Sequence, residues 1–144
     1  MKWKSGILVS IQMVCILIML VRIPFQHSDL WSFLVSFLGL LLVVWAVVTM
    51  KLDNISVRPD VRQNARLVTG GPYKVIRHPM YSATLLTFLP FVIDQPSMLL
   101  LIVFIALLIT LLFKMKYEEK LLRNHFKEYS SYSKHSWRLI PFIY

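Results

Sequence analysis

Four long uncharged stretches constrain this chain more than any other feature. They run from Gly6 to Val21, Leu30 to Met50, Pro79 to Ile93 and Gln95 to Phe113. A helix that crosses a bilayer needs roughly 20 apolar residues, with a range of about 17–25. The second and fourth stretches reach that length alone, the first reaches it with its flanks, and the third is shorter and starts with a proline. The pattern predicts an all-α, polytopic integral membrane protein with about four transmembrane helices.

The positive charges are distributed on one side of these four predicted spans. Fifteen of the sixteen Lys and Arg residues precede the first stretch, separate the second from the third, or follow the fourth, and only Arg22 lies elsewhere. Cytoplasmic loops carry the excess of Lys and Arg in membrane proteins. The sequence therefore predicts a multi-pass protein of the cytoplasmic membrane with both termini in the cytoplasm. The net charge of +9 is explained by a membrane surface, without a nucleic acid partner.

The length of 144 residues predicts one domain, residues 1–144, in which 1–50 form a scaffold hairpin and 51–144 the cofactor-binding and catalytic part. The single cysteine, Cys15, permits no intramolecular disulfide, indicates no metal site and is expected to pack inside the first span. No proline or glycine lies between Met98 and Asn124, so that helix should reach roughly 40 Å and project beyond the hydrocarbon core. The aromatic and basic residues that follow suit an interfacial C-terminal segment.

Two polar clusters fall at the predicted cytoplasmic interface. The first runs from Gly70 to Tyr81, with a Gly-Pro turn that allows close backbone approach to a ligand, and with Arg77 and His78 as donors for a carboxylate or a ribose. The second runs from Lys114 to Glu119. The first could instead anchor a helix at the headgroups, and the second could form ordinary ion pairs on a solvated helix face. A site for a ligand that carries both charges could use both clusters.

The stretch from Leu67 to Tyr81, with its Gly-Gly-Pro-Tyr and Arg-His-Pro-Met-Tyr elements, resembles the signature of the isoprenylcysteine carboxyl methyltransferase family. The Glu118-Glu119 pair, Tyr129, Tyr132 and the Arg138–Pro141 run are similar to the C-terminal half of that family. The resemblance covers roughly residues 54–141. Related phospholipid and thiol methyltransferases share these elements, so the likeness indicates the cofactor, S-adenosylmethionine, better than it indicates the acceptor.

The resemblance also implies roles for individual residues. The cofactor is expected to be surrounded by Ala65, Arg66, Leu67, Val68, Tyr73, His78, Pro79, Met80, Tyr81 and Glu118. A family arginine that contacts the prenylated substrate is replaced here by Lys114, which keeps the charge and loses the bidentate fork for a carboxylate. Ordinary snorkelling of Lys114 to lipid phosphates is the alternative, and Arg77 is the next candidate for the acceptor.

Methyl transfer from a sulfonium needs in-line positioning more than acid or base assistance. Holding two reactants in near-attack geometry supplies about 7–11 kcal/mol of the barrier reduction. A carboxylate or thiolate acceptor needs no base, whereas an amine would have to lose its proton to a group such as Glu119. The sequence thus predicts methyl transfer to a small lipid-like or prenylated acceptor, with membrane lipids as surroundings. A nicotinamide-dependent membrane reductase and a non-enzymatic lipid-binding subunit are the alternatives, and the oligomeric state is left open.

Overall fold

The computed structural model describes residues 2–23, 28–50, 66–94 and 97–144, and within them every regular element is helical. Three helices are long and apolar enough to cross a membrane: α1 (Lys2–Arg22), α2 (Leu30–Met50) and α4 (Met98–His125). A shorter apolar helix, α3 (Pro79–Asp94), lies between the latter two in sequence. A 3-10 helix, η2 (Gly71–Lys74), and the single-turn α5 (Tyr129–Tyr132) complete the elements. The predicted all-α, polytopic membrane fold is confirmed.

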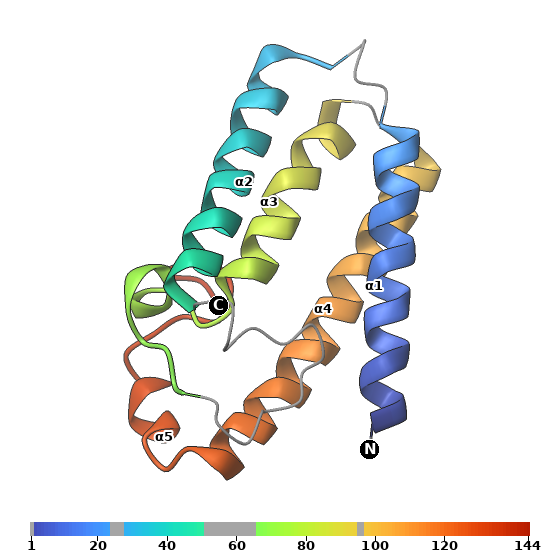
Figure 1. Ribbon diagram of the computed structural model, residues 1–144. Helices are drawn as coiled ribbons and strands as arrows, with labels where there is room; N and C mark the ends of the chain where they lie inside the picture. The colour runs from blue at the N-terminus through green and yellow to red at the C-terminus, as the bar shows by residue number, and fades with distance from the viewer. Residues whose placement is uncertain (1, 24–27, 51–65, 95–96) are drawn as a thin grey trace.

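The long helices form two antiparallel pairs. Helix α2 packs along α3, helix α1 packs along α4, and α3 and α4 join the two pairs (Figure 1). The beginning of α1 and the end of α4 lie at one end of the bundle, together with α5 (Figure 1). The end of α1 and the start of α2 lie at the opposite end (Figure 1). The residues after α4 are therefore on the same side of the bundle as the beginning of α1.

Small residues allow α2 and α3 to approach closely. A Cβ atom on Gly39 would meet the Thr87 side chain at 2.5 Å, the Thr87 amide nitrogen at 2.9 Å and the Ala83 carbonyl oxygen at 3.1 Å. One turn earlier, Ser36 donates a hydrogen bond of 2.7 Å to the carbonyl oxygen of Thr87. Interfaces between membrane helices are enriched in such small and hydroxylated residues because backbones can then touch. This interface fixes the register of α3 on α2.

Helix α3 is shorter than α2 at one end only. At its C-terminal end, the Asp94 carboxylate accepts hydrogen bonds from the Asp29 amide and the Ser32 hydroxyl, so this end is level with the start of α2. Its 16 residues span about 24 Å, against about 32 Å for the 21 residues of α2. The last turn of α2 therefore lies beside η2 and not beside α3. The residues just before α3 are set back along the bundle by about one to two helical turns.

The α1–α4 pair carries most of the apolar core. Cys15 and Met19 of α1, with Ile23 just after it, form one buried cluster with four residues of α4, namely Leu100, Val103, Leu107 and Leu111. The outward faces of α1 and α2 are rich in exposed large apolar side chains, as expected for helices that face lipid. Helix α4 continues without interruption for 28 residues, or about 42 Å, which agrees with the projection predicted beyond the hydrocarbon core.

Candidate active site

The glycine-proline turn before α3 packs against the end of α2. Gly71 has a φ of 53°, a conformation that L side chains rarely adopt, and a Cβ there would meet the Thr49 hydroxyl at 2.5 Å. The turn is also bonded to α5, because the Tyr132 hydroxyl donates a 2.6 Å hydrogen bond to the Tyr73 carbonyl oxygen. Burial raises the pKa of Tyr132 to about 12, so this phenol remains a donor at neutral pH. The close approach predicted for Gly71 is thus made to α2, with no requirement for a ligand.

The residues that follow this turn pair with the C-terminal tail, residues 137–144. An isolated parallel bridge joins Ile76 to Trp137, with Arg77 N donating to Trp137 O at 2.7 Å and Trp137 N donating to Val75 O at 2.9 Å. The amide of His78 continues the pattern by donating to the Arg138 carbonyl oxygen at 3.1 Å. The backbone amides of Arg77 and His78, just before α3, thus find their hydrogen-bond acceptors in the tail. This docking holds residues 76–78 and 137–138 beside the C-terminal half of α4.

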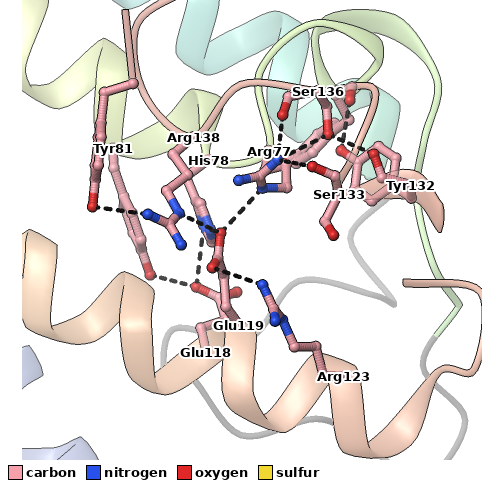
Figure 2. A network of polar contacts seen from close by, with 12 residues as sticks. Arg77, His78, Tyr81, Glu118, Glu119, Arg123, Tyr132, Ser133, Ser136 and Arg138 are labelled. Carbon is pink, nitrogen blue, oxygen red and sulfur yellow. Dashed lines mark hydrogen bonds and ion pairs between the residues drawn. The ribbon is translucent and has the colours of Figure 1, made fainter. Parts of the chain in front are cut away.

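Glu119 of α4 is the centre of an ion-pair network. Its Oε1 lies 3.1 Å from Arg77 Nε and 3.3 Å from Arg138 Nε, and its Oε2 lies 3.9 Å from the half-exposed Arg123 (Figure 2). The Glu119 residue is only 4% exposed. A carboxylate surrounded by guanidinium groups is stabilised in its ionised form and is a poor proton acceptor. These contacts favour a positioning role for Glu119 over general-base catalysis.

Arg77 is committed to the same network. Besides Glu119, its guanidinium donates through one terminal nitrogen to the Ser133 carbonyl oxygen at 2.8 Å and to the Ser136 carbonyl oxygen (Figure 2). Both acceptors belong to the segment that connects α5 to the tail. The side chain therefore ties together the start of α3, helix α4 and the tail. This arrangement favours an architectural role for Arg77, which the sequence proposed as a donor to substrate.

A second carboxylate, Glu118, joins residues from the start of α3. Its Oε2 accepts a 2.7 Å hydrogen bond from the Tyr81 hydroxyl and lies 3.7 Å from His78 Nδ1 (Figure 2). The His78 and Tyr81 rings stack with centroids 5.3 Å apart and planes inclined by 1°. His78, Tyr81 and Glu118 thus meet in one place, although about forty residues separate the first from the last. This is the grouping predicted for the cofactor site.

Several polar atoms at this place have no hydrogen-bond partner within the described part of the chain. The hydroxyl of the fully buried Tyr129 has no such partner, and the buried His78 Nε2 has only a long contact of 3.5 Å with Glu119 Oε1, which does not meet the geometry of a hydrogen bond. Glu118 is less buried, with a side chain that is 29% exposed, and its Oε1 takes part in none of these contacts. Buried polar groups are normally satisfied. These atoms are therefore candidates to hold polar groups of a bound molecule.

Lys114 is buried next to this group of residues. It is 5% exposed, and its ammonium donates a 2.8 Å hydrogen bond to the amide oxygen of Gln12 on α1. The ammonium also lies 5.3 Å from the centroid of the Tyr81 ring, a favourable cation–π distance. The Lys114 side chain thus points into the helix bundle. It does not extend toward the lipid phosphates, as a snorkelling lysine would. The partner Gln12 was not among the predicted site residues, although a long polar side chain inside an apolar span was a signal for it.

The remaining predicted cofactor residues are less well defined by contacts. Pro79 is buried in the first turn of α3, Met80 is half-buried beside it, and Leu67 and Val68 are half-buried before the turn. Arg66 is exposed and has interactions of its own, and Ala65 lies outside the described residues. Among the described side chains, no group of three His, Cys, Asp or Glu residues is arranged to hold a metal ion.

A comparison with known protein families shows which family this chain belongs to. The phospholipid methyltransferase family matches residues 28–129, which is 102 of the 144 residues. The chain belongs to the phospholipid methyltransferase family. This family is related to the isoprenylcysteine carboxyl methyltransferases, so the resemblance seen in the sequence is confirmed at the family level. No curated protein matches the chain.

Membership of this family implies a membrane methyltransferase with S-adenosylmethionine as its donor. It favours that activity over the nicotinamide-dependent reductase and over a non-enzymatic membrane subunit. The match includes α2, α3, α4 and the whole Glu118–Glu119 region, and it leaves α1 outside. The cofactor site expected from the resemblance lies inside the matched part.

Proposed function

We propose that this protein transfers a methyl group from S-adenosylmethionine to a lipid-like acceptor at the cytoplasmic face of the membrane. The observation that carries the proposal is the meeting of His78, Tyr81 and Glu118 at the start of α3 and the cytoplasmic half of α4. The family supplies the reaction class. The catalytic part, residues 51–144, would supply both the donor site and the acceptor site.

The described side chains fit the polar groups of S-adenosylmethionine. The Glu118 carboxylate has an oxygen available to accept from an ammonium group or from ribose hydroxyls. The Tyr129 hydroxyl, which has no hydrogen-bond partner among the described residues, offers a further polar contact nearby, and His78 Nε2 could add one beside its 3.5 Å contact with Glu119. When bound, S-adenosylmethionine supplies a methyl group that its sulfonium has already activated.

The protein's own residues would then act chiefly by orientation. Tyr81 fixes the Glu118 carboxylate through its hydroxyl, and the His78 ring is fixed by stacking on Tyr81 and by its backbone bond to the tail. Such side chains, locked by their neighbours, hold a reacting group in near-attack geometry. An ionised oxygen or sulfur acceptor would need no proton acceptor. An amine acceptor would have to arrive deprotonated, since Glu119 is occupied by arginines.

The buried ammonium of Lys114 indicates the class of acceptor. A buried cation is costly unless it is paired, and Lys114 has no ion pair among the described residues. An anionic group on an apolar molecule would pair with it while the chain of that molecule stays between the helices. Two sources share this chemistry, namely the phosphate of a phospholipid whose amine is methylated and the carboxylate of a prenylated thioether that is itself methylated.

We infer the orientation of the protein in the membrane from the distribution of its cations. The end of the bundle that carries α5 also carries the described Lys and Arg residues other than Arg22, which predicts that this end faces the cytoplasm. In a background in which Cys15 is replaced by alanine, Ser97→Cys should react with a membrane-impermeant maleimide added outside intact cells. Ser131→Cys should react only after the cells are opened. Labelling of Ser131→Cys from outside intact cells would show that the protein has the opposite orientation.

Methyl transfer itself is tested with labelled S-adenosylmethionine and the purified protein. Calorimetry should detect cofactor binding, and the label should pass to phosphatidylethanolamine in vesicles, to N-acetyl-S-farnesylcysteine, or to a component of total membrane lipid extract. If Lys114 binds the acceptor anion, Lys114→Gln should raise the acceptor KM by about 10–100-fold, because a hydrogen bond to a charged group contributes about 1.5–3 kcal/mol. Cofactor affinity should stay nearly unchanged.

Lys116→Gln is the matched control, because Lys116 lies on the same helix with an exposed side chain. It should turn over the acceptor like the parent protein. Absence of cofactor binding and of labelled product from every acceptor would overturn the proposed function. Turnover by Lys114→Gln with the parent KM would leave the function standing and move the acceptor site elsewhere.

A further inference from the structure

Gln12 breaks the pattern of the α1 face that packs on α4. That face is formed by Ser5, Cys15, Met19 and Ile23, which are buried and small or apolar. Gln12 shares their helical spacing but carries an amide, and it is half-buried. Polar side chains that face the interior of a membrane bundle are costly and are often functional. Because α1 lies outside the part of the chain that the family matches, the family does not account for this residue.

The contact that Gln12 makes is chemically selective. Its amide oxygen accepts from the Lys114 ammonium at 2.8 Å, across the α1–α4 interface. The ammonium has three donors, and this is the one hydrogen bond it makes within the described residues. A neutral acceptor fixes the position of a cation without cancelling its charge. A carboxylate at the same place would fix the position equally well and neutralise the charge.

Tyr81 connects this contact to the cofactor residues. Its ring lies 5.3 Å from the Lys114 ammonium, and its hydroxyl donates to Glu118 at 2.7 Å. One side chain therefore touches the cation expected to meet the acceptor and the carboxylate expected to meet the donor. If the ammonium moved, its distance from the Glu118 side of the site would change. The cation–π contact with Tyr81 alone would hold the Lys114 ammonium in place only weakly.

We propose that Gln12 is a positioning residue of the acceptor site, which holds the Lys114 ammonium over Tyr81 with its charge intact for an anionic group of the acceptor. The inference rests on the proposed function. It also gives α1 a part in the reaction, whereas the sequence assigned residues 1–50 a scaffolding role only. The competing explanation is that the Gln12–Lys114 hydrogen bond merely ties α1 to α4, as interhelical hydrogen bonds commonly do in membranes.

Gln12→Glu separates the two explanations. The new carboxylate keeps the hydrogen bond to Lys114, so both explanations predict a folded protein with thermal stability at least equal to that of the parent. If Gln12 preserves the charge of Lys114, neutralising that charge should raise the KM for the methylated acceptor by about tenfold or more. The acceptor probes are phosphatidylethanolamine vesicles, whose phosphate is the anion, and N-acetyl-S-farnesylcysteine, whose carboxylate is. The kcat at saturating acceptor and the affinity for S-adenosylmethionine should change little.

Gln12→Leu is the second variant, and it should also raise the acceptor KM because the ammonium loses its anchor. Ser10→Leu is the matched control, since it removes an exposed polar group from the same helix. A parent-like acceptor KM for Gln12→Glu would overturn the role of Gln12 and leave helix tethering as its function. Absence of any labelled product from the parent protein would overturn the proposed function and this assignment with it.

Discussion

Glu119→Gln is expected to lower the thermal stability of the protein more than any other single change in the polar network. The substitution conserves the shape of the side chain and removes its charge. The buried guanidinium of Arg77, with a side chain that is 8% exposed, would lose its carboxylate, and Arg138 would lose the same partner. Removing one partner of a buried ion pair costs about 3–5 kcal/mol, because the remaining charge stays buried without compensation.

Thermal unfolding in mild detergent, followed by near-ultraviolet circular dichroism, measures this effect. Glu128→Gln provides the control, because Glu128 is an exposed glutamate just after α4, and its loss should leave the unfolding temperature within error of the parent. Arg123 contributes little to the expected loss, since its side chain is 52% exposed and lies 3.9 Å from Glu119. Equal unfolding temperatures for Glu119→Gln and the parent would show that the network does not stabilise the fold.

Glu118→Gln should abolish most of the affinity for S-adenosylmethionine while leaving the fold intact. The amide can still accept the hydrogen bond from the Tyr81 hydroxyl, so the local geometry is retained. What is lost is the negative charge for an ammonium or hydroxyl donor of the cofactor. A hydrogen bond to a charged group contributes about 1.5–3 kcal/mol, so the dissociation constant should rise by about 10–100-fold.

Isothermal titration of the purified variants tests this assignment. Tyr81→Phe serves as a companion variant, because it frees the Glu118 carboxylate without removing its charge and should weaken binding less than Glu118→Gln does. Glu128→Gln should bind the cofactor like the parent. If Glu118→Gln is folded and binds S-adenosylmethionine with parental affinity, Glu118 is outside the cofactor site, and the grouping of His78, Tyr81 and Glu118 has another purpose.

The helices of this protein could be predicted closely from the sequence. Uncharged stretches of sufficient length form helices in a bilayer, because every backbone N–H and C=O group must find a hydrogen-bond partner within the segment. The predicted stretch Leu30–Met50 is the observed α2, and α3 begins at Pro79, the first residue of the third stretch. Helix α4 begins at Met98, three residues after the start of the fourth stretch at Gln95 and at the first residue of the run without proline or glycine. The continuation of α4 past the membrane also follows locally, from the absence of a helix-breaking residue as far as Asn124.

The contacts of the site could be predicted only in part. The resemblance to a family placed Glu118 with His78 and Tyr81, because it carries information about tertiary contacts that spacing within one chain lacks. It could not give the partners of Glu119, since Arg77 and Arg138 reach it through the bridge between Ile76 and Trp137. That register depends on long-range backbone pairing.

The Gln12–Lys114 contact was beyond sequence reasoning for a different reason. It depends on the rotation of α1 about its own axis against α4, which is set by the packing of the two apolar faces. Hydropathy describes α1 as a span but does not say which neighbour its one long amide will meet. A polar residue in an apolar span could be recognised as unusual, and its partner could not be named.

The docking of the tail onto the start of α3 has a consequence for synthesis. Helices α1 to α4 are complete once His125 has been made, yet His78 still lacks the carbonyl group of Arg138, and Arg77 lacks that of Ser133. Domains fold from the N-terminus while the ribosome adds about 5–20 residues per second. The donors at the start of α3 therefore cannot be satisfied before residues 133–139 have been made and have left the ribosome, so this docking is a late step of folding. A chain that ends before Ser133 would keep helices α1 to α4 but leave the Arg77 guanidinium and the His78 amide without these acceptors.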